Sequence, residues 1–183
     1  MSILITTEDT TGKGKPLPNA KWSGVFEEAS ITPEGNGTRF FARLGQITTP
    51  DGNTVYTNGN TAPYNIGNRK VFVREWTDHT SVRATEIGQR RIKQIIIAAG
   101  LAPKPTAGQT VEVNLTFEQV AEEVVGKRVL FSSKQVARLS RKQEDKDAWS
   151  AANPGANVPD LVPALDSDGT PKIDVEVSVF HSA

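Results

Sequence analysis

The sequence contains no cysteine, and this absence excludes a disulfide framework, a thiolate nucleophile and a cysteine-ligated zinc site. Its two histidines, His79 and His181, are too few for a three-histidine metal site, and no His-x-x-x-His pair occurs. The phosphate-binding motif Gly-x-x-x-x-Gly-Lys-Ser/Thr and the nucleophile motif Gly-x-Ser-x-Gly are also absent. The sequence therefore predicts no metal, no cofactor and no enzymatic activity.

Long apolar runs are missing as well. The longest, Ile95 to Ala99, is far shorter than the roughly 18 residues that a membrane-spanning helix needs. The N-terminus lacks the basic region and the apolar stretch of a signal peptide. We therefore expect no membrane association and a cytoplasmic location.

The chain has no net charge, with 21 basic and 21 acidic residues, which argues against a generic polyanion-binding protein. The charges are nevertheless unevenly distributed. Between Lys127 and Lys146 there are seven cations and only two anions. Because binding responds to the local field, a neutral chain can still carry a basic groove. The alternative is an ordinary surface on which charges cluster by chance.

Strands are predicted where β-prone residues alternate with polar ones between turn motifs. Lys21 to Ile31 and Arg39 to Ile47 flank a Pro-Glu-Gly-Asn-Gly turn and form a hairpin, and a third strand covers Arg69 to Trp76. Later in the chain, Val111 to Leu115 fits a short strand, Lys127 to Arg141 fits one long strand or two short ones, and Ile173 to Val179 alternates strictly.

Two helices are predicted. The longer one begins after Thr80 or Ser81 and runs to about Ala99, with Gly100 placed to end it. Its apolar stripe comprises Val82, Ile87, Ile92, Ile95, Ile96 and Ala99. A shorter helix from Phe117 to about Val125 follows a capping-box pattern that starts at Thr116.

This order of elements predicts a mainly β fold. Three strands, a long helix, a fourth strand and a last strand match the five-stranded OB barrel, in which a helix separates strands three and four. The ligand face of that barrel is formed by strands two and three and by the loops that join strands 1–2 and 4–5. We expect a flexible arm over residues 1–19 and a single OB-like domain over residues 20–183, with a small extra helix and long loops at 50–68 and 143–171.

The third strand carries the candidate site. Alternation places Val71 and Val73 on one face, which is natural core, and sends the intervening side chains to the other. That second face alternates cation and aromatic: Lys70, Phe72, Arg74 and Trp76. Single-stranded nucleic acid needs this chemistry, because aromatic rings stack on exposed bases while cations contact phosphates.

The second strand shows the same division. Phe40, Ala42 and Leu44 share one face, and Arg39, Phe41 and Arg43 share the other. Within the basic stretch, Arg138, Arg141 and Lys142 are candidates for further phosphate contacts, and Trp149 could either cover a base or anchor its loop. The alternative interpretation is that Phe72 and Trp76 are buried and the cations form a rim around them.

A resemblance supports the binding interpretation. The run from Ser81 to Leu101, which ends in Ala-Ala-Gly-Leu, and the later Leu115-Thr116-Phe117-Glu118 and Gly126-Lys127 are similar to segments of a bacteriophage family of single-stranded DNA-binding proteins. The resemblance covers about residues 21–141. It implies an OB-like barrel used in phage replication or recombination, and it identifies no binding residues.

We therefore expect sequence-independent binding of single-stranded DNA in the cytoplasm of a host cell, with replication or recombination proteins as candidate partners and a homo-oligomer as a further possibility. Many such proteins recruit partners through an acidic C-terminal tail, but this chain ends Val179-Phe180-His181-Ser182-Ala183. The alternative function is a structural or assembly protein of a phage particle. Exposure of Phe72 and Trp76 would favour nucleic acid, whereas burial against another subunit would favour assembly.

Overall fold

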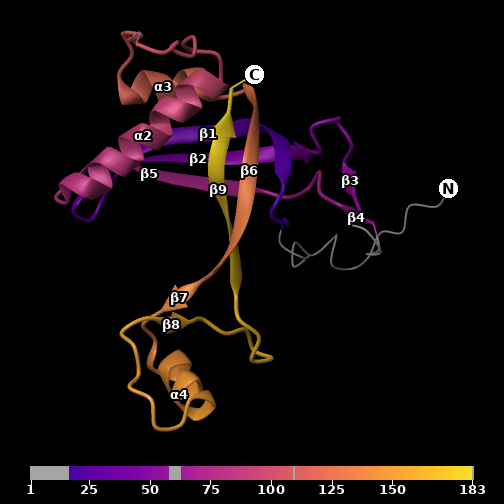
Figure 1. Ribbon diagram of the computed structural model, residues 1–183, viewed down its shortest axis with the longest axis vertical. Helices are drawn as coiled ribbons and strands as arrows, with labels where there is room; N and C mark the ends of the chain where they lie inside the picture. The colour runs from indigo at the N-terminus through magenta and orange to yellow at the C-terminus, as the bar shows by residue number, and fades with distance from the viewer. Residues whose placement is uncertain (1–16, 58–62, 109, 183) are drawn as a thin grey trace.

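The long strands of the chain form one antiparallel sheet. The computed structural model describes residues 17–57, 63–108 and 110–182, and its elements carry the labels of Figure 1. The sheet contains β1 (Lys21–Glu34), β2 (Gly37–Thr48), β5 (Val71–His79), β6 (Arg128–Ala137) and β9 (Ile173–His181), in the order β5-β2-β1-β6-β9. The fold is therefore mainly β, as the alternating patterns predict.

The sheet is open, whereas the sequence predicts a barrel. β5 and β9 are its edge strands, and no ladder joins them among the described residues. Arg91, on helix α2 (Val82–Ala98), lies between the two edges. Its guanidinium donates hydrogen bonds to the carbonyls of Val177, at 2.9 Å, and Ser178, at 2.8 Å, and lies 3.6 Å from a carboxylate oxygen of Glu75. A side chain thus connects edges that a backbone ladder would join in a closed barrel.

The core lies between the inner face of the sheet and the helices α2 and α3 (Phe117–Val124), which lie close together at one end of the sheet (Figure 1). Its largest fully buried side chains include Trp22, Phe26, Phe40, Phe131, Ile92 and Ile95. Burial of these side chains from two layers is the main source of stability.

The predicted long helix is confirmed as α2. The Ser81 hydroxyl caps it by accepting a hydrogen bond from the backbone N–H of Ala84, at 3.4 Å. The predicted apolar stripe is correct at its C-terminal half and wrong at Val82 and Ile87, which are 71% and 49% exposed. Only the last three turns of α2 cover the core, so the first turns face solvent on all sides that do not contact β5.

The shorter helix is also confirmed. Thr116 and Gln119 form the reciprocal capping box that the sequence predicts. The predicted strand at Val111 to Leu115 is wrong: these residues have no regular secondary structure. Val113 and Leu115 still pack against the core, so their alternation reflects half-burial of an extended segment that has no partner strand.

Both predicted long loops contain secondary structure. The first includes the short hairpin of β3 (Val55–Tyr56) and β4 (Tyr64–Asn65). The second includes helix α4 (Gln143–Ala152) and β8 (Val162–Pro163), which pairs with β7 (Leu139–Ser140). Residues 138–172, which we call the appended module, project from one end of the sheet (Figure 1).

Helix α4 lacks the apolar stripe by which helices are recognised in a sequence. Glu144 and Asp145 lie in its first turn, where negative charge interacts favourably with the helix dipole. The buried carboxylate of Asp145 also accepts a hydrogen bond from the backbone N–H of Leu165, at 3.1 Å. Charges in the first turn and a hydrogen bond to a distant backbone group therefore help to hold this helix, and neither gives an apolar stripe in the sequence.

Residues 1–16 of the predicted arm lie outside the described residues. The last three residues of that arm contact β6. Leu17 is only 2% exposed, and its carbonyl accepts a hydrogen bond from the Gln135 side chain, at 3.0 Å. The Asn19 side chain accepts another from the Gln135 backbone N–H, at 2.7 Å. Residues 17–19 thus belong to the folded part of the chain.

One strained position offers a stability test. Gln46, near the end of β2, has a φ of 49°, in the left-handed region that costs a non-glycine residue about 1–2 kcal/mol. Gln46→Gly should remove this strain at a smaller entropic cost and raise the free energy of unfolding by about 0.5–1 kcal/mol. Urea titration measures the change. Gln46→Ala is the control and should bring no gain, because alanine keeps the Cβ that causes the strain.

Candidate nucleic-acid interface

The pairing of β2 with β5 brings the two sets of predicted side chains onto one surface. Across the ladder Arg39 lies opposite Trp76, Phe41 opposite Arg74, and Arg43 opposite Phe72. The opposite faces of these strands, with Phe40, Ala42, Leu44, Val71 and Val73, are buried in the core. We call the six outward residues the β2–β5 face. The inward and outward side chains of β2 and β5 are thus those that the alternation predicts.

Phe72 is the most accessible aromatic ring of the β2–β5 face. Its side chain is 49% exposed. The ring of Phe41 lies beside it, with centroids 6.0 Å apart and planes inclined at 31°. The guanidinium of Arg74 lies 6.0 Å from the Phe41 ring centroid. Two rings and a cation are therefore grouped where a base and its phosphate could be held together.

Trp76 is placed differently. Its side chain is half-buried, and the guanidinium of Arg39 lies over its ring at 3.9 Å from the centroid. The His79 ring lies 4.4 Å from the Trp76 ring. Behind it, Gly88 of α2 approaches so closely that a Cβ at that position would overlap the Trp76 backbone. Trp76 thus already stacks with a cation, and a base must replace or extend that stack.

Most cations near this face have carboxylate partners. Arg39 pairs with Glu34 at 3.1 Å, Arg43 with Glu27 and Glu28 at 3.4 and 3.2 Å, and Lys70 with Glu27 at 2.6 Å. Arg74 makes no ion pair within the described part of the chain. Phosphates would therefore bind Arg74 directly and the other cations by exchange with carboxylates.

Glu27 is a member of this cluster that sequence alternation does not identify. It lies at an irregularity in the β1–β2 register, between Phe26 and Glu28. A hydrogen bond from Lys70 lowers the pKa of the Glu27 carboxyl below its usual value. A Cβ at Gly45 would overlap this carboxylate. The position depends on a bulge and on a glycine across the ladder, and neither has a distinctive sequence pattern.

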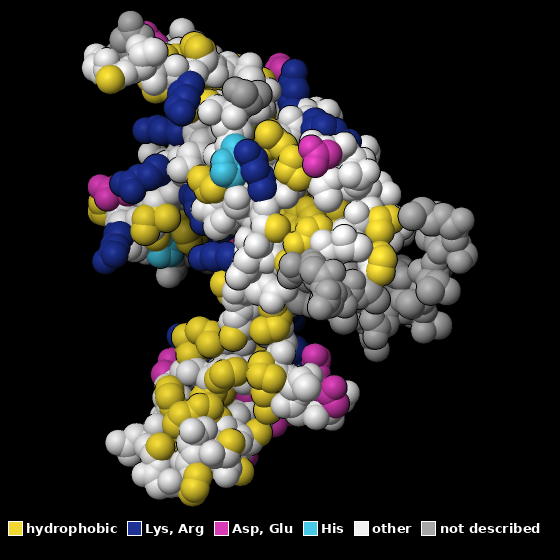
Figure 2. All heavy atoms as spheres, turned by 45° about the vertical axis from the view of Figure 1, so that its right-hand side comes forward, with side chains coloured by type: hydrophobic (Ala, Val, Ile, Leu, Met, Phe, Trp, Pro, Cys, Tyr) yellow, Lys and Arg dark blue, Asp and Glu magenta, His cyan; other side chains and the backbone are white. Residues whose placement is uncertain are grey.

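A groove of about 1010 Å³ lies along the free edge of β5 and is also lined by residues of β9. We call it the β5–β9 groove. Of its sixteen lining residues, six are cations, namely Arg39, Arg69, Lys70, Arg74, Arg91 and Arg138, and three are carboxylic acids, Glu75, Asp174 and Glu176. The groove is therefore positive in a chain of zero net charge. Figure 2 shows Lys and Arg side chains gathered along one flank of the larger part of the molecule.

Glu75 is the unusual acid of this groove. It lies on the inner side of β5, opposite Phe40 in the ladder. Burial raises the pKa of Glu75 from the ordinary 4.5 to about 7, and the negative charge of Glu176 adds to this increase. The positive charges of Arg91 and Arg39 oppose it. The sequence predicts neither this burial nor the role of Arg91, because both depend on how α2 crosses the open edge.

The other predicted cations lie away from the β2–β5 face. Arg138 lies at the start of the appended module, lines the β5–β9 groove and forms a charged pair with Asp174. Arg141 pairs with Asp160 at 3.1 Å and Lys142 with Glu144 at 3.5 Å, both within the module. Trp149 is half-buried on α4. Arg141, Lys142 and Trp149 are thus not grouped with the six residues of the β2–β5 face.

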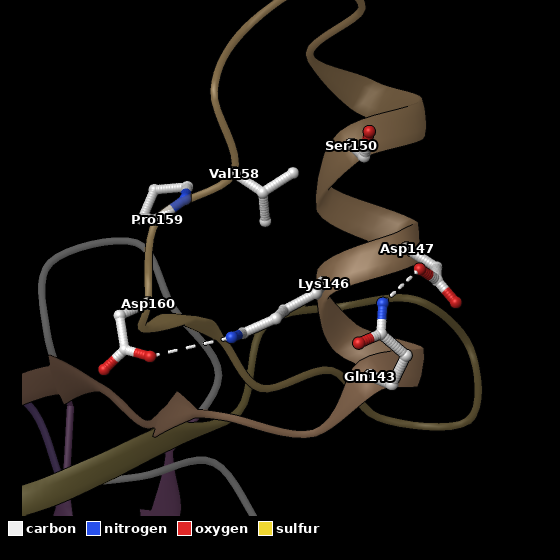
Figure 3. Close-up of a pocket in the computed structure, with 7 residues that line it drawn as sticks. All are labelled: Gln143, Lys146, Asp147, Ser150, Val158, Pro159 and Asp160. Carbon is white, nitrogen blue, oxygen red and sulfur yellow. Dashed lines mark hydrogen bonds and ion pairs between the residues drawn. The ribbon is translucent and has the colours of Figure 1, made fainter.

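A second pocket lies inside the appended module. It measures about 520 Å³ and is bounded by α4 and by residues 158–160 (Figure 3). Its polar side chains bind one another: Lys146 pairs with Asp160 at 3.7 Å, and the Gln143 amide donates to Asp147 at 2.7 Å. The lining of this pocket thus holds one cation and two acids, whereas cations outnumber acids in the lining of the β5–β9 groove.

Residues 17–57, 63–108 and 110–182 contain no cluster of three or more His, Asp or Glu side chains that could hold a metal ion. Within the same ranges, no helix combines the length and apolar character that crossing a membrane requires. No protein-family model matches the chain, and a search of curated proteins finds no similar sequence.

Proposed function

We propose that this chain is a non-catalytic protein that binds single-stranded DNA on the β2–β5 face, without sequence preference, during bacteriophage replication or recombination. The observation that carries the proposal is the exposed Phe72 ring, grouped with Phe41 and Arg74 and continuous with a positive groove. Rings of this kind stack on unpaired bases, and duplex DNA offers no such free base face.

The strand order supports an OB-like fold, and we propose that the open sheet is a variant of that fold. Across the sheet, from one edge to the other, lie the third, second, first, fourth and fifth long strands of the chain. Helix α2 lies in the chain between the third of these strands, β5, and the fourth, β6. An OB fold is a partly open five-stranded barrel that binds oligonucleotides on its second and third strands. In this chain those strands are β2 and β5, the two that carry the candidate face.

Fluorescence anisotropy with labelled single-stranded and duplex oligonucleotides of equal length tests the function. We expect tighter binding of the single strand. We also expect a shallow salt dependence, with a log–log slope between about −0.7 and about −2, which corresponds to one to three neutralised phosphates. The slope should be small because most cations of the face already have carboxylate partners.

Equal affinity for the duplex would contradict the proposal. The alternative function, a structural or assembly protein of a phage particle, predicts no binding of either oligonucleotide and self-association at higher protein concentration. Light scattering on the same samples detects that self-association. Replication or recombination proteins remain the partners that we propose for the DNA-bound form, in the cytoplasm of the host cell.

A further inference from the structure

The β5–β9 groove and the β2–β5 face are parts of one surface. Arg39, Phe72 and Arg74 belong to the face and also line the groove. This overlap exists because β5 is an edge strand, so that side chains from both of its faces reach the groove. A strand of nucleic acid lying across Phe72 therefore has two ways to continue, along β2 or over the edge of β5.

The charges favour the second route. On the β2 side, Arg43 is held by the two carboxylates of Glu27 and Glu28. Over the edge of β5, the groove lining holds six cations and three acids. One of these cations, Arg74, makes no ion pair within the described residues, whereas Arg39, Lys70, Arg91 and Arg138 each have a carboxylate partner. A polyanion follows the more positive path, because a groove with low-dielectric walls concentrates the field of its charges.

The far wall of the groove has a replaceable anion. Arg138 is bound by the carboxylate of Asp174, and the two side chains are 55% and 39% exposed. Arg138 donates three hydrogen bonds to the two carboxylate oxygens of Asp174, and a phosphate can accept the same two-pronged set of bonds in its place, because its oxygens match the guanidinium in geometry and charge. Ile173, which is 41% exposed, and the half-buried Val175 line the same wall and offer apolar contact to a sugar or base.

We propose that single-stranded DNA leaves the β2–β5 face over the edge of β5 and follows the β5–β9 groove to Arg138, where a phosphate replaces the Asp174 carboxylate. This inference rests on the proposed function, and it adds a second segment to the site. The open edge of the sheet thus gives the strand a channel that a closed barrel would not provide.

The chain offers a matched pair of variants. Asp174→Asn frees Arg138 in the groove. Asp160→Asn makes the same change in charge in the appended module, where it frees both Arg141 and Lys146 away from the groove. Asp174→Asn should tighten binding of long oligonucleotides by about threefold or more, and Asp160→Asn should change it much less. With oligonucleotides of about four nucleotides, which cover only the face, the two variants should behave alike.

Arg138→Gln and Arg141→Gln give the opposite test. Only Arg138→Gln should weaken binding of the long oligonucleotide, by about 3- to 10-fold, and only it should reduce the salt slope. If Asp174→Asn and Asp160→Asn changed the affinity equally, and Arg138→Gln and Arg141→Gln did so too, the groove path would be overturned. The proposed binding on the β2–β5 face would not be affected. Failure of the unmodified protein to bind single strands would instead overturn the proposed function, and the groove path with it. Thermal melting of each variant confirms that the fold is retained.

Discussion

Phe72→Ala is expected to weaken the binding of single-stranded DNA by about 5- to 150-fold, because stacking of one base on an aromatic ring contributes roughly 1–3 kcal/mol. Phe72 is the ring to remove because it is 49% exposed, and because the cation–ring contacts of the described residues on this face involve Trp76 and Phe41 instead. Phe72→Trp should retain most of the affinity, since a stacking surface remains. Anisotropy titration with a single-stranded oligonucleotide measures both variants.

The matched control is Ile87→Ala. Ile87 is exposed to the same extent, 49%, but lies on α2 outside the β2–β5 face. The Ile87→Ala variant should bind single-stranded DNA with the affinity of the unmodified protein. If Phe72→Ala and Ile87→Ala bind alike, base stacking on this face is excluded. Both melting temperatures should stay close to that of the unmodified protein, because neither side chain belongs to the buried core.

Trp76→Ala should weaken binding less than Phe72→Ala. Alternation alone makes the two rings equivalent, since both point outward from β5. The structure separates them, because the Arg39 guanidinium occupies a position 3.9 Å from the Trp76 ring centroid. A larger loss at Trp76 than at Phe72 would show that Arg39 moves away and leaves the indole as the main stacking surface.

The division of each strand into a core face and an outer face could be predicted from the sequence, because alternation in β2 and β5 depends only on the geometry of an extended chain. The ends of α2 and α3 could be predicted for a similar reason. Ser81 and Thr116 cap their helices through hydrogen bonds to N–H groups only three residues later. Local geometry therefore determines these features.

The features that alternation could not predict depend on contacts between distant segments. The open edge between β5 and β9 is bridged by Arg91, which donates hydrogen bonds to residues 86 and 87 positions later in the chain. The ion pair of Lys70 with Glu27 joins residues 43 positions apart across a bulge. Helix α4 has no apolar stripe, and its one buried residue is an acid, Asp145, which accepts a hydrogen bond from the backbone of Leu165, 20 positions later. None of these contacts leaves a periodic pattern in the sequence.

The open edge also makes the stability of the fold depend on pH through Glu75. Burial raises the pKa of Glu75 from 4.5 to about 7 in the folded chain. The folded state therefore binds the Glu75 proton more tightly than the unfolded state does. The resulting contribution to stability is fully present below about pH 4.5, is lost as the pH rises toward about 7, and is absent above that value.

Glu75→Gln should therefore stabilise the protein at pH 8 and do so much less at pH 5, the glutamine being neutral at both values. The rise in the pKa of Glu75 from 4.5 to about 7 corresponds to about 3 kcal/mol of folding free energy, at 1.4 kcal/mol per pKa unit. The Glu75 side chain is still 17% exposed, and screening by solvent reduces the expected gain to about 2 kcal/mol. Urea titrations of the unmodified protein and of Glu75→Gln at several pH values give the difference between their free energies of unfolding. The contributions of all other acids cancel in that difference.

Glu122→Gln controls for the loss of one negative charge, because Glu122 is an exposed glutamate on α3. Its free energy of unfolding should differ from that of the unmodified protein by less than about 0.5 kcal/mol over the same pH range. A Glu75→Gln effect that is constant from pH 5 to pH 8 would mean that Glu75 stays ionised in the folded protein. The Arg91 guanidinium, 3.6 Å away, would then outweigh the cost of burying the carboxylate, and the open edge would be held by a permanent ion pair.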